Sequence, residues 1–116
     1  MYGRFDPLRA GHIHLLEQAR AACDRLVVGL YDDASVRRHK GPNQPEQPEA
    51  VRAARLASLG CVDLVVVIGD GDSADLIGTL RPDILAGTRR PAEADLVRGY
   101  GGKVLLTGRL AESTGT

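Results

Sequence analysis

The chain has 116 residues, of which 43% are hydrophobic and 26% charged, and its 15 basic and 15 acidic side chains cancel to a net charge of zero. This composition is typical of one soluble globular domain. The balanced charge argues against a large nucleic-acid surface, and the longest apolar run, Leu64–Ile68, is far too short to span a membrane. Because Arg4, Asp6 and Arg9 interrupt any apolar signal region, we expect a cytoplasmic protein without nucleic-acid or membrane partners.

A glycine-containing turn opens the chain and runs directly into a helical pattern. Gly3, Asp6, Gly11 and His12 lie in this turn, and the apolar spacing that follows predicts a helix over residues 11–22. Backbone N–H groups, a helix dipole and an imidazole would then converge at one point, which suits a phosphate group. The turn therefore predicts a site for the polyphosphate of a nucleotide.

Short apolar runs alternate with helical patterns along the rest of the chain. The apolar runs predict strands over residues 26–30, 62–68, 84–85 and 104–106. The helical patterns cover residues 48–59, 73–80 and 92–99; Pro48 is expected to open the first of these helices and Ser73 to cap the second.

Continuously apolar strands separated by helices predict a parallel sheet that is covered on both faces. With right-handed crossovers this is a three-layer, doubly wound, Rossmann-like α/β fold, in a single domain over residues 1–116. Ligands of such sheets bind beyond the carboxyl ends of the strands, where the turn at residues 3–12 would lie.

The most irregular stretch is the proline-rich segment 39–48, which we expect to be a mobile loop over the site. Lys40 in this loop could reach a phosphate as a point charge, although a solvated lysine is the simpler interpretation. Arg52 and Arg55 lie three residues apart on one helix face, and they either bind an anion or sit in water.

Several single residues leave alternatives open. His12 could donate a hydrogen bond to a phosphate oxygen or cap the helix, whereas His14 points to another face and is expected to be solvated or packed. Asp6 could help to hold Mg²⁺ or could fasten the loop by accepting backbone N–H bonds. Cys23 and Cys61 lack the spacing of a metal or redox site and are expected to be buried, inert thiols.

An ordered series of short motifs runs along nearly the whole chain: Gly3-Arg4-Phe5-Asp6, Ala10-Gly11-His12, Asp33-Ala34-Ser35, Lys40-Gly41-Pro42, Val62-Asp63, Arg81-Pro82-Asp83, Tyr100-Gly101-Gly102 and Ser113-Thr114. In this order and spacing they resemble the cytidylyltransferase-like nucleotidyltransferases, whose signature is a Gly-x-Phe-Asp turn followed by His-x-Gly-His. Within that family the chain is most similar to the domains that adenylylate D-glycero-β-D-manno-heptose 1-phosphate.

The resemblance implies transfer of the adenylyl group of ATP to a sugar 1-phosphate, with release of pyrophosphate. It implies a homodimer, and Mg²⁺ that is carried by the triphosphate rather than by a metal site of the protein. It also implies catalytic roles for His12, Arg9 and Lys40, and contacts of Lys40 and Arg52 with the sugar phosphate. The nucleotide would be bound by Gly3, Arg4, Phe5, Asp6, Gly11, His12, Arg89, Ser113 and Thr114.

The chain also departs from the family's pattern. Arg9 stands where the first motif histidine is expected, and a guanidinium can bridge phosphate oxygens but cannot act as a neutral donor. Arg89 is the expected substitute for a lysine that the family carries after its fourth strand. Only Met1 and Tyr2 precede the turn and relatives continue beyond Thr116, so we expect a domain that is clipped at both ends.

These departures keep two alternatives beside the adenylyltransferase. One is a CTP-dependent cytidylyltransferase that acts on glycerol phosphate or another alcohol phosphate. The other is a catalytically impaired relic that still binds nucleotide.

Overall fold

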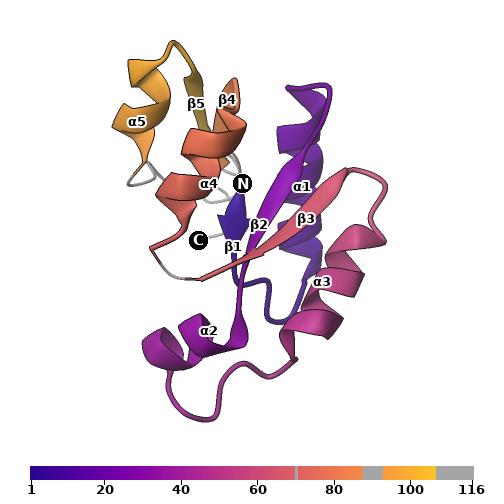
Figure 1. Cartoon of the computed structure of the whole chain (residues 1–116). Coiled ribbons are helices and arrows are strands. Elements are labelled where there is room, and N and C mark those ends of the chain that lie inside the picture. The colour runs from indigo at the N-terminus through magenta and orange to yellow at the C-terminus, as the bar shows by residue number, and fades with distance from the viewer. Residues whose placement is uncertain (70, 88–92, 107–116) are drawn as a thin grey trace.

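The structure is a computed structural model of the chain, and it describes residues 1–69, 71–87 and 93–106. Strands and helices alternate within those ranges, as the sequence predicts (Figure 1). In chain order they are β1 (Tyr2–Gly3), α1 (Ala10–Ala21), β2 (Val27–Tyr31), α2 (Asp33–Lys40), α3 (Glu49–Ala57), β3 (Leu64–Ile68), α4 (Ser73–Leu80), β4 (Ile84–Gly87), α5 (Ala94–Gly99) and β5 (Lys103–Leu106).

The strands pair in parallel in two groups. One sheet has the order β1-β2-β3, with Gly29 at the centre of β2 opposite both Tyr2 and Val66. The other consists of β4 and β5, in which Ile84 pairs with Lys103. The chain moves outward from β1 to β3 and then returns to β4 and β5 beyond the other side of β1 (Figure 1). This reversal is the hallmark of a doubly wound sheet, so the predicted Rossmann-like α/β fold is confirmed.

Helices cover both faces of the β1-β2-β3 sheet. Val28 and Leu30 of β2 are buried in one cluster with Leu16 of α1 and Leu56 of α3. Gly29, which faces the other way, lies against Leu76 of α4. A strand with alternate residues buried on opposite faces requires this three-layer packing.

Helix α2 is not among the helices that the sequence predicts. Its stretch, Asp33–Lys40, is mostly polar and lacks an apolar stripe, but Asp32 caps it: Oδ1 of Asp32 accepts a hydrogen bond of 2.8 Å from the backbone N–H of Ser35. His39 and Lys40 therefore belong to a helix and not to the proline-rich loop.

The rest of that loop is tied to the turn after β1 by two hydrogen bonds. The backbone N–H groups of Glu46 and Gln47 donate to the two carboxylate oxygens of Asp6, at 2.7 Å and 2.9 Å. Charge-assisted bonds of this kind hold a loop more firmly than neutral ones. Of the two roles considered for Asp6, the structure thus shows the fastening one.

Smaller differences concern helix starts and the thiols. Pro48 occupies the N-cap position of α3 rather than its first turn, and Ser73 does not cap α4 but donates its hydroxyl hydrogen to Glu93 Oε1 at 2.6 Å. Cys23 and Cys61 are free and only partly buried.

No helix within the described ranges is both long enough and apolar enough to pass through a membrane.

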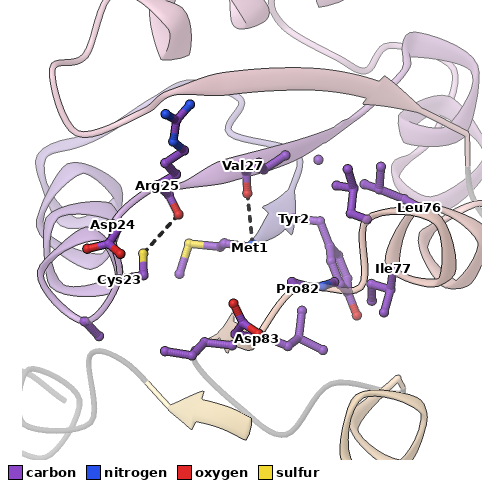
Figure 2. Close-up of a pocket in the computed structure, with 15 residues that line it drawn as sticks. Met1, Tyr2, Cys23, Asp24, Arg25, Val27, Leu76, Ile77, Pro82 and Asp83 are labelled. Atoms are coloured by element: carbon purple, nitrogen blue, oxygen red, sulfur yellow. Dashed lines mark hydrogen bonds between the residues drawn. The ribbon is translucent and has the colours of Figure 1, made fainter. Parts of the chain in front are cut away.

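A cavity of about 620 Å³ separates the two groups of strands at their amino ends (Figure 2). Met1 and Tyr2 project into it, between Val27 at the start of β2 and the segment Pro82–Leu85 that leads into β4. Because ligands of doubly wound sheets bind at the opposite, carboxyl edge, this cavity is distinct from the candidate site.

Candidate functional site

The first turn of α1 brings His12 next to Arg9. Arg9 is the N-cap residue, and its backbone N–H donates to Nδ1 of His12 at 3.1 Å. An imidazole whose Nδ1 accepts a hydrogen bond carries its proton on Nε2 when it is neutral. The helix cap thereby selects the tautomer that can donate from Nε2, so the two roles considered for His12, capping and donation, are compatible. His14, two residues on, is exposed as expected.

Three basic side chains converge at this helix end. Burial lowers the pKa of His12, and the positive charges of Arg9 and Arg4 lower it further. These effects favour the neutral form of the imidazole, and both arginine side chains are exposed. Gly11 leaves open space above the same turn, since a Cβ placed there would have no neighbour within 4 Å. Positive charge, free helix N–H groups and open space together suit a phosphate.

The Phe5 ring packs against the imidazole of His12. It meets the imidazole edge-on, with the ring centroids 5.5 Å apart, and it also covers Gly3, where a Cβ would lie 3.3 Å from Cε2. The Phe5 backbone has a positive φ of 48°, which is uncommon for a residue with a large side chain. The turn after β1 thus adopts an unusual conformation that directs the ring toward the helix.

A second cavity, of about 300 Å³, adjoins this turn at the carboxyl ends of β1 and β2. Lys40, at the end of α2, lines this cavity together with Gly3 and Arg4. The cavity wall includes residues that the sequence did not assign to the site, although they lie at or after the end of β2, at the edge where ligands bind: Tyr31, Ser35, Val36 and His39.

Arg52 is neither a solvated side chain nor an exposed anion ligand, so the sequence expectation for it is wrong. The residue is only 1% exposed, and its guanidinium makes four hydrogen bonds within the protein. Its donors reach Gln47 O (2.9 Å), Arg4 O (2.9 Å), Tyr31 O (2.8 Å) and Asp33 Oδ1 (2.8 Å). A buried guanidinium needs such partners to offset the loss of hydration, and these bonds replace the expected contact with a sugar phosphate.

Within the described residues, no group of three or more histidine, cysteine, aspartate or glutamate side chains could hold a metal ion. Both carboxylate oxygens of Asp6 are already engaged by the loop. Arg89, Ser113 and Thr114, which the sequence assigns to the nucleotide, lie outside the described residues.

The parallel, doubly wound arrangement places the chain in the class of Rossmann-like α/β proteins. The model of the cytidylyltransferase-like family matches residues 1–108, and the chain belongs to that family of nucleotidyltransferases.

Particular relatives are also similar. The bifunctional protein HldE of Paramagnetospirillum magneticum is 51% identical over 109 residues, which cover 90% of this chain, and that of Pseudomonas putida (strain F1) is 44% identical over 119 residues, which cover 98%. The chain spans only about a quarter of their length, namely 22% and 25%.

One solved structure resembles the chain over most of both molecules. The lipopolysaccharide core biosynthesis protein of Thermoplasma volcanium is 30% identical and superposes with a TM-score of 0.74. The match covers 90% of this chain and 88% of that protein.

Proposed function

We propose that the chain transfers the adenylyl group of ATP to a sugar 1-phosphate of the heptose-phosphate type and releases pyrophosphate. The observation that carries the proposal is the convergence of neutral His12 with Arg4 and Arg9 at the start of α1. The similarity to HldE proteins and to a lipopolysaccharide core biosynthesis protein supports a sugar phosphate as the acceptor.

The proposed chemistry is an attack by a phosphate oxygen of the sugar on the α-phosphate of ATP. A bond forms between the attacking sugar-phosphate oxygen and the α-phosphorus, while the bond from the α-phosphorus to the pyrophosphate oxygen breaks. Negative charge accumulates on the phosphate oxygens. Nε2–H of His12 donates to this charge, Arg4 and Arg9 attract it, and Lys40 approaches from α2. Mg²⁺ enters as part of the nucleotide substrate, coordinated by phosphate oxygens and water.

The test is pyrophosphate release by His12→Ala. Losing one donor to a developing charge costs about a hundredfold or more in rate, so turnover should nearly vanish while the circular dichroism spectrum stays unchanged. His14→Ala is the matched control, because His14 is exposed on the same helix and should leave the rate unaffected. Transfer at the parent rate by His12→Ala would refute the site.

Two alternatives have their own support. The first turn, Tyr2-Gly3-Arg4-Phe5-Asp6, is also compatible with a CTP-dependent enzyme, so release should be compared for ATP and CTP with panels of sugar and alcohol phosphates. Arg9 in place of the motif histidine favours an impaired relic, which would bind ATP in a calorimeter without releasing pyrophosphate.

We also propose a homodimer. Among the described strands, β3 pairs only with β2, and its Leu64 and Val67 are 51% and 44% exposed. An apolar strand edge of this kind favours association with a second copy. Sedimentation equilibrium measures the stoichiometry, and a monomer at micromolar concentration would contradict the proposal.

A further inference from the structure

We propose that Arg52 is a positioning residue for His12: its buried guanidinium fixes the peptide between Arg4 and Phe5, and through that peptide the ring that packs against the imidazole. The inference depends on the proposed function only where the catalytic rate is concerned. The geometric link it describes can be tested without any substrate.

The first step is the connection made by the guanidinium. Arg52 lies on α3, yet its Nη1 donates both to the carbonyl of Arg4, after β1, and to the carbonyl of Tyr31, at the end of β2. Its Nη2 contacts Asp33 at the start of α2, and its Nε contacts Gln47 in the loop before α3. One side chain thus ties together four segments around the candidate site.

The second step is the peptide that this side chain holds. The carbonyl of Arg4 belongs to the peptide unit whose orientation is coupled to the φ of Phe5. Phe5 has a φ of 48°, a conformation that costs free energy and persists only where the surroundings enforce it. The 2.9 Å hydrogen bond from Arg52 to this carbonyl supplies such enforcement from a fully buried position.

The third step leads from Phe5 to His12. The Phe5 ring is 8% exposed and meets the imidazole edge-on at 5.5 Å between centroids. His12 is also acted on by the backbone N–H of Arg9 and by the charges of Arg9 and Arg4, and Arg4 belongs to the same held peptide. Loosening that peptide therefore disturbs both the packing and the charge around His12.

The experiment compares Arg52→Lys with the control Arg55→Lys, one turn further along α3, where the arginine is exposed. Lysine keeps the positive charge but cannot reproduce the fork of hydrogen bonds. The first readout is the proton NMR titration of the His12 ring. We expect its midpoint to rise in Arg52→Lys, towards the ordinary value of histidine, because burial and the Arg4 charge both act less on a displaced imidazole.

The second readout is the rate of pyrophosphate release. We expect kcat of Arg52→Lys to fall about tenfold or more while KM for ATP changes much less, because misplacing a donor affects mainly the transition state. Arg55→Lys should match the parent in both readouts. A folded Arg52→Lys with an unchanged His12 titration would overturn the inference, whatever its rate.

Two further results are decisive. If Arg52→Lys does not fold, Asp33→Asn, which replaces the ion pair of Arg52 with a neutral contact, decides: a rise of the His12 midpoint supports the link and no change refutes it. If the parent releases no pyrophosphate from any nucleotide, the proposed function fails, while the His12 titration still tests the positioning role.

Discussion

At the scale of single residues, the site depends on which hydrogen bonds are already made inside the protein. Arg52 and Asp6 carry charges, but their polar atoms bind backbone groups of neighbouring segments. His12 uses Nδ1 within the helix cap, which places the proton of the neutral ring on Nε2. The same residue types can therefore be structural or functional, and the partner of each polar atom decides between these roles.

Position 9 allows a direct test at this scale. Arg9→His should raise the rate of pyrophosphate release by about tenfold or more, because a second neutral imidazole donor replaces a longer, permanently charged group. The pKa of His12 should rise at the same time, since the Arg9 charge lowers it in the parent. Stopped-flow rates and the NMR titration measure both effects, and an unchanged rate would remove position 9 from the chemistry.

At the scale of elements, strand β2 is held tightly between its neighbours. A Cβ on Gly29 would lie 3.1 Å from Cβ of Tyr2, 3.2 Å from Cδ1 of Ile68 and 3.3 Å from Cδ2 of Leu76. A methyl group at Gly29 would therefore have to displace these neighbours by a few tenths of an ångström.

Two glycine substitutions test this packing. Gly29→Ala should lower the free energy of unfolding by about 1–3 kcal/mol, as overpacked cores do. Gly78→Ala, within α4 and with no neighbour within 4 Å of its Cβ, should raise it by about 0.5–1 kcal/mol, since alanine favours helix more than glycine. Urea denaturation of both variants gives the values; equal effects of the same sign would contradict the packing described.

At the scale of the whole molecule, Glu93 links the two groups of strands. Its carboxylate accepts hydrogen bonds from the hydroxyls of Tyr2, in β1, and Ser73, at the start of α4. No strand ladder joins the two sheets within the described residues. The halves are held together by this contact, by Tyr2 packed against the cluster of Ile77, Leu85 and Val97, and by Ala86 of β4, which is buried in the cluster around β2.

The stability of this link should depend on pH. Burial alone would raise the pKa of Glu93, but the hydrogen bonds from Ser73 and Tyr2 lower it overall from 4.5. A carboxyl with a lowered folded-state pKa stabilises the fold above its unfolded-state pKa, and this stabilisation is lost as the pH falls through the folded-state value.

Glu93→Gln should therefore be less stable than the parent at pH 7, and the difference should shrink as the pH falls below about 4.5. Urea denaturation at pH 7 and pH 3.5 measures it, with Glu17→Gln, exposed on α1, as the control. A difference that stays constant across this range would show that the Glu93 charge does not stabilise the link.

The order of elements and the location of the site follow from local patterns. Strands, helices and the Gly3–His12 turn can each be identified from the pattern of a few neighbouring residues. The structure confirms the parallel, doubly wound arrangement that these patterns predict. The family is likewise evident from motifs that are contiguous in the chain.

Helix α2, the anchoring of the loop by Asp6 and the burial of Arg52 could not be predicted in this way. Helix α2 has a local cap but no apolar stripe to reveal it. The other two depend on partners distant in sequence: Arg52 binds Arg4, 48 residues away, and Asp6 binds Gln47, 41 residues away. The fold and the candidate phosphate site could be predicted from the sequence alone, because periodicity and turn chemistry are local. Only the tertiary structure decided which charged side chains remain available to a ligand, because desolvation and hydrogen bonding are settled by packing between distant segments.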